Sequence, residues 1–291
     1  MTNGGLRILV GLGLAIGASI AAVDAQQPAA PQPVKPAVEQ PATQQPATPQ
    51  PAPQAASTDP RVGLKPGFDD AEVAALNMEL VSHLQKPEGF FDPAALGDLN
   101  YANSDFAFRD DILFQGNFHG FNFYNIEDPR QPKLRTSVAC PGGQGDLSVY
   151  GNLLFMSVEQ TRGRLDCGTQ GVEEAVSAER FRGVRIFDIS DLRKPVQIAA
   201  VQTCRGSHTH TLVANPDDKE KIYIYGSGTG SVRPGEELEG CSGLDPKEDP
   251  NTALFSIDVI EVPLLAPATA KIVNRPRIFA DETSGSIAGL W

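Results

Sequence analysis

The sequence lacks the short motifs that mark several common enzyme classes. It contains no Gly-x-Ser-x-Gly nucleophile motif and no His-Glu-x-x-His zinc motif. Two glycine-rich stretches, residues 141–145 and 226–230, are not followed by Gly-Lys-Ser/Thr. They therefore do not form a phosphate-binding loop of that kind. The classes that these motifs identify are excluded as a first interpretation.

Basic residues are scarce relative to acidic ones. The 291 residues include 24 Lys and Arg against 36 Asp and Glu, which gives a formal net charge of −12 at pH 7. A sequence-independent nucleic-acid binder needs clustered cations that displace counterions from phosphates. Docking on an anionic membrane surface needs the same kind of charge. We therefore expect neither nucleic acid nor an anionic membrane as a partner.

A long apolar run is also missing at the N-terminus. The apolar stretch over residues 8–22 follows Arg7 and is about 15 residues long, short of the roughly 20 that a spanning helix needs. Small residues follow at 23–25. This pattern predicts a signal peptide over residues 1–25, cleaved after Ala25, and a periplasmic or secreted protein without a membrane span. A retained N-terminal anchor is the alternative.

Two further segments precede the informative part of the chain. Residues 26–58 contain 9 Pro, 8 Gln and 8 Ala, which predicts a disordered, extended linker. Residues 59–100 are expected to be an N-terminal helical extension. Within it, apolar residues at 73, 76, 80 and 84 recur at helical spacing, which predicts a helix from Asp69 to Gln85.

An internal repeat extends over residues 101–291. Residues 105–114 align without a gap with residues 146–155, and both have the pattern of a β-hairpin. Residues 120–132 match residues 183–195 in the same way, and each match is followed by a further strand pattern. Weaker third copies begin at His210 and at Ala253. A unit of four strands in about 41 residues predicts β-propeller blades. An all-β sandwich is the alternative.

Two insertions fall at equivalent places in successive units. They comprise residues 159–180 and 228–252. Insertions at equivalent loops lie on one face of a propeller, and this face often binds ligands. The insertions are therefore the expected binding face.

The segment Gly183-Val184-Arg185-Ile186-Phe187-Asp188-Ile189-Ser190-Asp191, followed by Pro195, resembles the LVIVD-repeat proteins. These are exported bacterial β-propellers of mostly unassigned function. The resemblance covers residues 103–280 and implies an all-β propeller fold. In the third unit, residues 260–263 replace the Ser-Asp turn, so the strand boundaries of that unit depart from the pattern.

The repeat is too short for a closed ring. A propeller closes with typically four to eight blades, whereas residues 101–291 provide about three. Open arrays leave strand edges unpaired, which folded proteins avoid. We therefore expect an N-terminal fragment of a longer ring, or a chain whose ring is completed by a homo-oligomer.

All four cysteines lie in the repeat. An even number of cysteines in an exported chain favours disulfides. Cys140 and Cys204 occupy equivalent positions, and Cys167 and Cys241 lie in the equivalent insertions. Of the three possible connectivities we favour Cys140–Cys204 with Cys167–Cys241. A zinc site is not expected, because the cysteines are widely spaced and no Cys-x-x-Cys exists.

The most specific candidate site is Ser-His-Thr-His at residues 207–210. In a strand, His208 and His210 point to the same side, where they are candidate ligands of a divalent metal ion. Asp146 and Asp105 occupy the position of His210 in the preceding units, so Asp105, Asp146 and His210 are candidates for a polar ring around the central channel. The alternative is that these groups hydrogen-bond to neighbouring strands or to channel water.

Two functional hypotheses follow. The first is an exported β-propeller that binds or scaffolds at the cell envelope, with a protein, a polysaccharide or a small molecule as partner. The second is a metal-dependent propeller enzyme, an oxidoreductase or hydrolase, with a His/Asp site at the channel. The enzyme requires a tightly bound metal and a complete ring, whereas the binding module requires neither.

Overall fold

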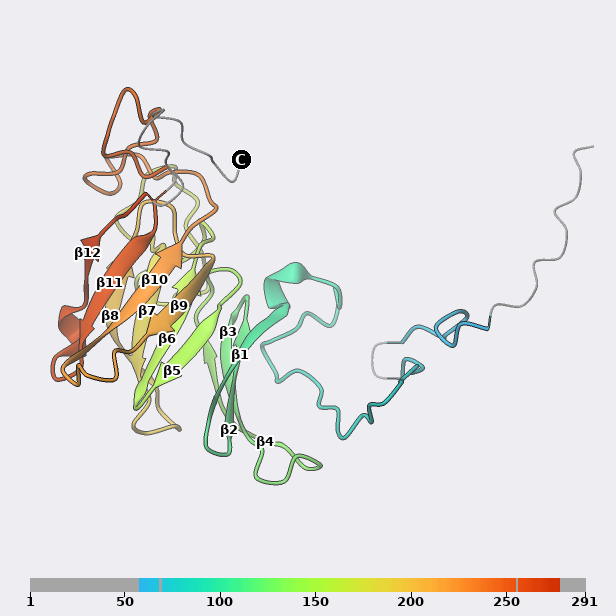
Figure 1. Ribbon diagram of the computed structural model, residues 1–291. Coiled ribbons are helices and arrows are strands. Elements are labelled where there is room, and N and C mark those ends of the chain that lie inside the picture. Colours follow the sequence, from blue (N-terminus) through green and yellow to red (C-terminus); the bar gives the residue numbers. More distant parts are fainter. Residues whose placement is uncertain (1–57, 68–69, 255, 278–291) are drawn as a thin grey trace, which may run out of the picture. The chain divides into compact units, whose positions relative to one another are not determined.

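The computed structural model describes residues 58–67, 70–254 and 256–277. In this part of the chain, twelve strands form three four-stranded antiparallel sheets, each with its strands in chain order (Figure 1). The predicted signal peptide and the predicted linker up to residue 57 lie outside the described residues.

Each sheet is one blade. Blade 1 contains β1 (Asn103–Arg109), β2 (Ile112–Asn117), β3 (Gly120–Asn125) and β4 (Lys133–Ala139). Blade 2 contains β5 (Leu147–Tyr150), β6 (Leu153–Val158), β7 (Gly183–Asp188) and β8 (Val196–Gln202). Blade 3 contains β9 (Thr209–Val213), β10 (Lys221–Ser227), β11 (Asp258–Pro263) and β12 (Lys271–Asn274). Two short 3-10 helices, η1 (Leu99–Tyr101) and η2 (Pro267–Thr269), complete the elements.

The predicted fold class is confirmed. The described chain is all-β, and its three blades form an unclosed, propeller-like array. The first strands of the blades lie side by side, with β5 between β1 and β9. The residues that precede or begin these strands therefore come close to one another.

Apolar side chains between adjacent blades form the cores. Phe121 of β3 packs on Phe187 of β7, with ring centroids 5.0 Å apart, so blade 1 and blade 2 share one aromatic core. Ile186, Ile224 and Ile260 belong to a second core between blades 2 and 3. All five of these side chains are at most 2% exposed. Because apolar burial contributes about 25 cal/mol per Å², the packing of blade on blade stabilises the array.

At one position of the repeat, the backbone geometry requires a particular residue. Gly120 and Gly183 begin the third strand of blades 1 and 2, with φ of +146° and +145°. A Cβ at either residue would lie 2.0 Å from the carbonyl oxygen of Val138 or Val201. Only glycine fits this close approach of neighbouring strands.

The third strand of blade 3 differs from the prediction. The repeat placed it from Ala253, whereas β11 begins at Asp258 and includes residues 260–263. In this register Val259 pairs with Tyr225 and Val262 pairs with Ile222 of β10, so Ile260 and Val262 reach the core. The burial of Ile260 and Val262, and not the alignment with the repeat, therefore determines which residues form β11. The second insertion is correspondingly longer than residues 228–252.

The predicted helix from Asp69 to Gln85 is wrong. Residues 70–85 contain no helix, and Asp69 lies outside the described residues. An isolated helix of this length is marginal in water without a packing partner. Here Leu76 is 84% exposed and the segment is irregular, with Ser82 Oγ donating to the carbonyl oxygen of Pro129. The extension over residues 59–100 is therefore not helical where it is described, apart from η1.

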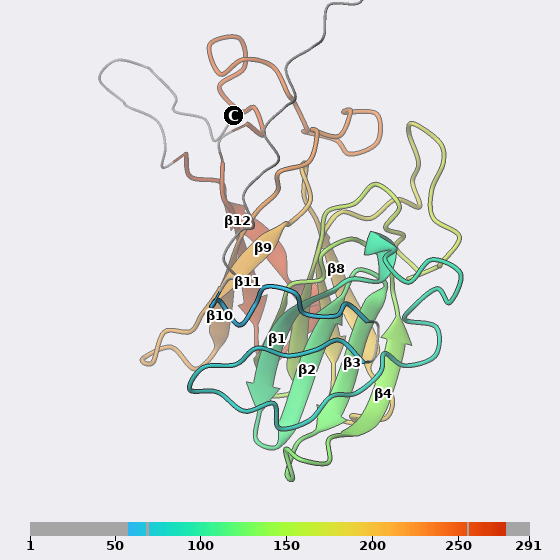
Figure 2. The same cartoon turned by 90° about the vertical axis from the view of Figure 1, so that its right-hand side faces the viewer.

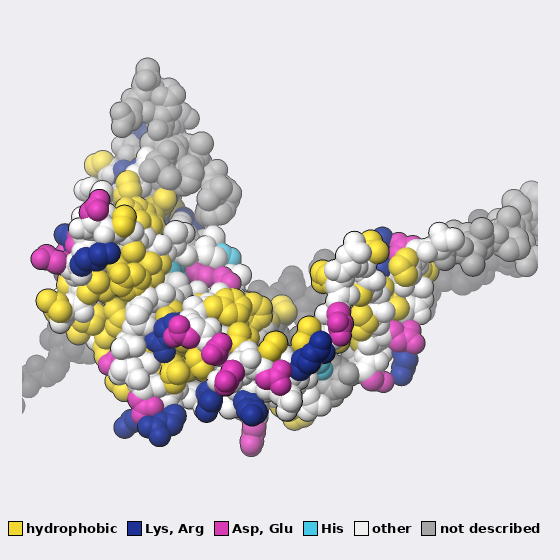
Figure 3. Space-filling model, turned by 60° about the horizontal axis from the view of Figure 1, so that its bottom comes forward, with side chains coloured by type: hydrophobic (Ala, Val, Ile, Leu, Met, Phe, Trp, Pro, Cys, Tyr) yellow, Lys and Arg dark blue, Asp and Glu magenta, His cyan; other side chains and the backbone are white. Residues whose placement is uncertain are grey.

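Apolar side chains are exposed at two places on the surface, one beside this segment and one on blade 3. Residues 81–86 and the outward face of blade 1, including Phe106, Leu113 and Tyr124, line a cavity of about 710 Å³. On blade 3, Val213 and Tyr225 are also exposed. Hydrophobic side chains accordingly gather in patches between charged ones on the face shown in Figure 3.

Candidate functional site

A hydrogen-bond network joins the first strands of blades 2 and 3. The side chain of His210 of β9 is fully buried, and its Nδ1 lies 2.8 Å from Asp146 Oδ2 and 2.8 Å from Ser157 Oγ. Its Nε2 lies 2.7 Å from Ser148 Oγ, and its backbone N–H donates to Asp146 Oδ2 over 2.6 Å. Ser157 Oγ in turn lies 2.9 Å from Ser207 Oγ. The imidazole ring of blade 3 thus contacts polar side chains from two strands of blade 2.

Asp105 of blade 1 extends this network. It shares a side-chain hydrogen bond with Asp146; that bond and burial raise the pKa of Asp105 above its ordinary value. Burial alone would raise the pKa of Asp146, but hydrogen bonds from His210 and Asp105 outweigh burial and lower it. The structure therefore brings Asp105, Asp146 and His210 together, as a chain from blade 1 to blade 3.

The order Ser148–His210–Asp146 matches that of a nucleophilic triad. In such a triad the histidine must exchange a proton with the substrate, however, and the side chain of His210 is completely buried. A cavity of about 230 Å³ lies alongside, and its lining includes Asp105 and Asp146 but not Ser148. The arrangement therefore couples the blades and does not present a nucleophile.

His208 and His210 do not converge on one point. His208 Nδ1 lies 2.7 Å from Glu159 Oε2, whereas His210 contacts Asp146. Within the described ranges, no group of three or more His, Cys, Asp or Glu residues is placed to hold a metal ion. Each histidine binds its own carboxylate because the strand begins at Thr209, so that His208 belongs to the preceding loop.

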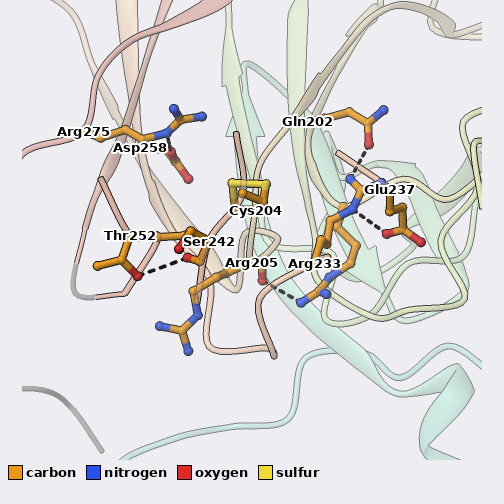
Figure 4. The surroundings of a disulfide bond; sticks show 12 residues. Gln202, Cys204, Arg205, Arg233, Glu237, Ser242, Thr252, Asp258 and Arg275 are labelled. Carbon is orange, nitrogen blue, oxygen red and sulfur yellow. Dashed lines mark hydrogen bonds and ion pairs between the residues drawn. A yellow bond between two sulfur atoms is a disulfide. The ribbon is translucent and has the colours of Figure 1, made fainter. Parts of the chain in front are cut away.

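The predicted disulfide pairing is wrong, although all four cysteines are paired. The disulfides are Cys140–Cys167 and Cys204–Cys241. Cys140 follows β4 and Cys204 follows β8, so each bond ties an insertion to the end of the preceding blade. Figure 4 shows the surroundings of the bond of Cys204. The Cα atoms of the bonded pairs lie 4.3 Å and 5.3 Å apart, whereas equivalent positions of neighbouring blades are separated by the width of the core between them.

The two insertions lie at the same end of the sheets (Figure 2), and a buried ion triad joins them. Glu237 of the second insertion is 1% exposed and accepts hydrogen bonds from Arg180 of the first insertion and Arg233 of its own. Arg233 Nε lies 2.6 Å from Glu237 Oε1 (Figure 4). Burial would raise the pKa of Glu237, but the hydrogen bonds from Arg233 and the Ser177 amide lower it. The carboxylate therefore stays ionised between two guanidinium groups.

Glu159 fixes the start of the second insertion. Its Oε1 accepts hydrogen bonds from the amides of Thr229 and Gly230 and from Thr229 Oγ1. Burial would raise the pKa of Glu159, but the bonds from His208 and Thr229 lower it. Together with the disulfides and the ion triad, this contact holds both loops in one arrangement.

A polar cavity of about 470 Å³ opens between the two insertions, at the end of the sheets that carries them. It is lined by Asn100, Glu159, Gln160, Thr161, Arg162, Arg182, Gly230 and Ser231. We call it the insertion pocket. Its residues come from both insertions, from the start of β7 and from η1. It is thus assembled only when blades 2 and 3 pack together.

The two arginines of the insertion pocket donate to uncharged oxygen atoms. Arg162 donates to Gln160 Oε1 over 2.7 Å and to the carbonyl oxygen of Phe118 over 2.9 Å. Arg182 is 3% exposed and donates to the carbonyl oxygens of Ser231 and Arg205, and its Nε has no hydrogen-bond partner in the described structure. Burial lowers the pKa of both arginines. A negatively charged group would offset this cost.

Sequence reasoning pointed to the insertions but not to these residues. The missed signal is the density of arginine around the first insertion, in Glu-Arg-Phe-Arg-Gly-Val-Arg over residues 179–185. Arginines so close to an apolar strand must be buried at least in part, and buried guanidinium groups need partners. Arg180, Arg182 and Arg185 are all buried.

Comparisons with known proteins give no relative. No protein-family model matches the sequence, and no curated protein matches it either. The resemblance to LVIVD-repeat proteins therefore stays a prediction. Two disulfides indicate an oxidising, extracellular environment. In the described ranges, no helix is long and apolar enough to cross a bilayer.

Proposed function

We propose that the chain is an exported binding or scaffolding module of the cell envelope, and that it binds its partner with the insertion-bearing end of the array. The observation that carries this proposal is that one disulfide anchors each insertion to the preceding blade and that the buried Glu237 joins the two insertions to each other. Loops fixed before binding lose little conformational entropy when a partner docks. Binding residues often lie on such loops, held by a rigid scaffold.

The metal-dependent enzyme has less support. His208 and His210 contact different carboxylates, and the groups around His210 are used to couple blades. Completion of the ring, by further blades or by a second copy, stays a prediction. The binding proposal does not depend on it, because the residues that line the insertion pocket come from η1 and from blades 2 and 3.

The experiment is a sedimentation assay of the full chain with purified peptidoglycan and with envelope polysaccharide fractions. Val176→Asp and Leu244→Asp change exposed apolar side chains of the two insertions. Val196→Asp and Leu134→Asp are matched controls away from the insertions, with similar exposures of 49% and 46% against 46% and 54%. We expect the insertion variants alone to lose binding by about tenfold or more.

Equal loss in the control variants, or unchanged binding in all four, would contradict the assignment of the insertion end. Circular dichroism of each variant checks that the fold is retained.

A further inference from the structure

We infer that the insertion pocket binds the carboxylate of an acidic sugar, with Arg162 and Arg182 as the recognising groups. This inference rests on the proposed binding function and names the chemical class of its ligand. The guanidinium group presents a planar fork that matches a carboxylate in a bidentate manner.

The charge of the pocket supports an anionic ligand. Three ionised side chains line it, and these are Arg162, Arg182 and Glu159. The Glu159 carboxylate is already occupied by His208, Thr229 and Gly230. The hydrogen-bond acceptors of the two guanidinium groups are amide and carbonyl oxygens, and the lining carries two cationic side chains against the one carboxylate of Glu159, so the pocket keeps a net positive charge.

The remaining lining groups favour a sugar over a simple anion. Asn100, Thr161 and Ser231 add amide and hydroxyl groups around the arginines. Such groups donate to and accept from hydroxyls, and a cavity of about 470 Å³ exceeds what one small anion fills. The net charge of −12 disfavours a ligand of high negative charge density, which the whole molecule repels.

The test is isothermal titration of the full chain with three probes at equal ionic strength. Galacturonate carries the carboxylate on a sugar ring, galactose has a neutral hydroxymethyl group in its place, and succinate carries carboxylates without a ring. We expect galacturonate to bind at least about tenfold more tightly than either of the others. Its affinity should fall as salt is raised, because charges near the surface are screened.

The variant is Arg162→Gln, which should weaken galacturonate by about tenfold or more, whereas Arg162→Lys keeps the charge and should lose less. Arg193→Gln is the matched control. It removes the same charge from an exposed side chain on the turn after β7, at the strand end opposite Arg182. It should leave binding unchanged.

If galactose binds as tightly as galacturonate, the carboxylate is not recognised. If succinate binds as tightly as galacturonate, the sugar ring is not recognised. No binding of any probe, or unchanged affinity in Arg162→Gln, would overturn the site. If the sedimentation assay still maps binding to the insertions in that case, the binding module stands and only this inference fails. If the insertion variants also bind normally, both fail.

Discussion

Removal of single cysteines offers a quantitative test of how the blades are tied together. The two disulfides close loops with sequence separations of 27 and 37 residues. The chain-entropy relation then assigns about 3.5 kcal/mol to Cys140–Cys167 and about 3.8 kcal/mol to Cys204–Cys241. Cys140→Ala should therefore lower the free energy of unfolding by about 3.5 kcal/mol.

Double variants separate the observed pairing from the alternative. Adding Cys167→Ala to Cys140→Ala removes no further cross-link, so the pair should cost little more than the single change. Adding Cys204→Ala removes the second cross-link, and the combined loss should approach about 7 kcal/mol. Urea unfolding without reductant gives these free energies.

Thiol mapping provides a second readout that does not require a folded variant. In Cys140→Ala, alkylation after denaturation should label Cys167 alone, because Cys204 and Cys241 remain bonded to each other. Labelling of Cys204 instead, or strong coupling between Cys140 and Cys204 in the double-variant comparison, would refute the pairing and the account of how each insertion is anchored.

Three further predictions concern buried polar groups. His210→Ala should lower the free energy of unfolding by about 2–5 kcal/mol, because it leaves buried hydroxyl and carboxyl partners unsatisfied; His208→Ala, at a half-exposed ring, is the control for the same urea experiment. Glu237→Gln should cost about 3–5 kcal/mol, since two buried guanidinium groups lose their charge partner. The stability that Glu237 contributes is present above its ordinary pKa and is lost as pH falls through its lowered pKa, which urea midpoints across pH should show. The raised pKa of Asp105 has the opposite sign, so the wild type loses stability as pH rises through that pKa. Asp105→Asn should therefore be the more stable protein at pH 7 and equal to the wild type below about pH 3.9. A gain that persists in acid would show that ionisation of Asp105 is not its cause.

The sequence was sufficient to predict the blades because their signals are local. Alternating apolar residues, turn residues and a fixed spacing recur in the first two units. Asp128, Asp188 and Asp191 accept hydrogen bonds from the amide two residues later, as residues that form turns do. The outline of the fold needed no knowledge of long-range contacts.

The wrong predictions concern features that depend on what a segment packs against in the folded chain. Residues 70–85 have helical spacing but are irregular, and β11 begins later than its repeat because burial selects another register. Cysteine pairing likewise depends on distances between blades. The insertion pocket could not be predicted because Arg182 and Ser231 meet only after two loops have folded over different sheets.

The pairing of each insertion with the end of the blade before it also has a consequence for oxidative folding. Along the chain the cysteines bond in consecutive order, first with second and third with fourth. In a chain that emerges from its N-terminus, Cys140 and Cys167 can therefore bond before Cys204 and Cys241 appear, and once that bond has formed the last two cysteines have only each other. Native bonds can form as synthesis proceeds, and slow thiol–disulfide rearrangement is not required to reach them. The order of the cysteines thus allows each insertion to be anchored to its blade before the rest of the chain is available.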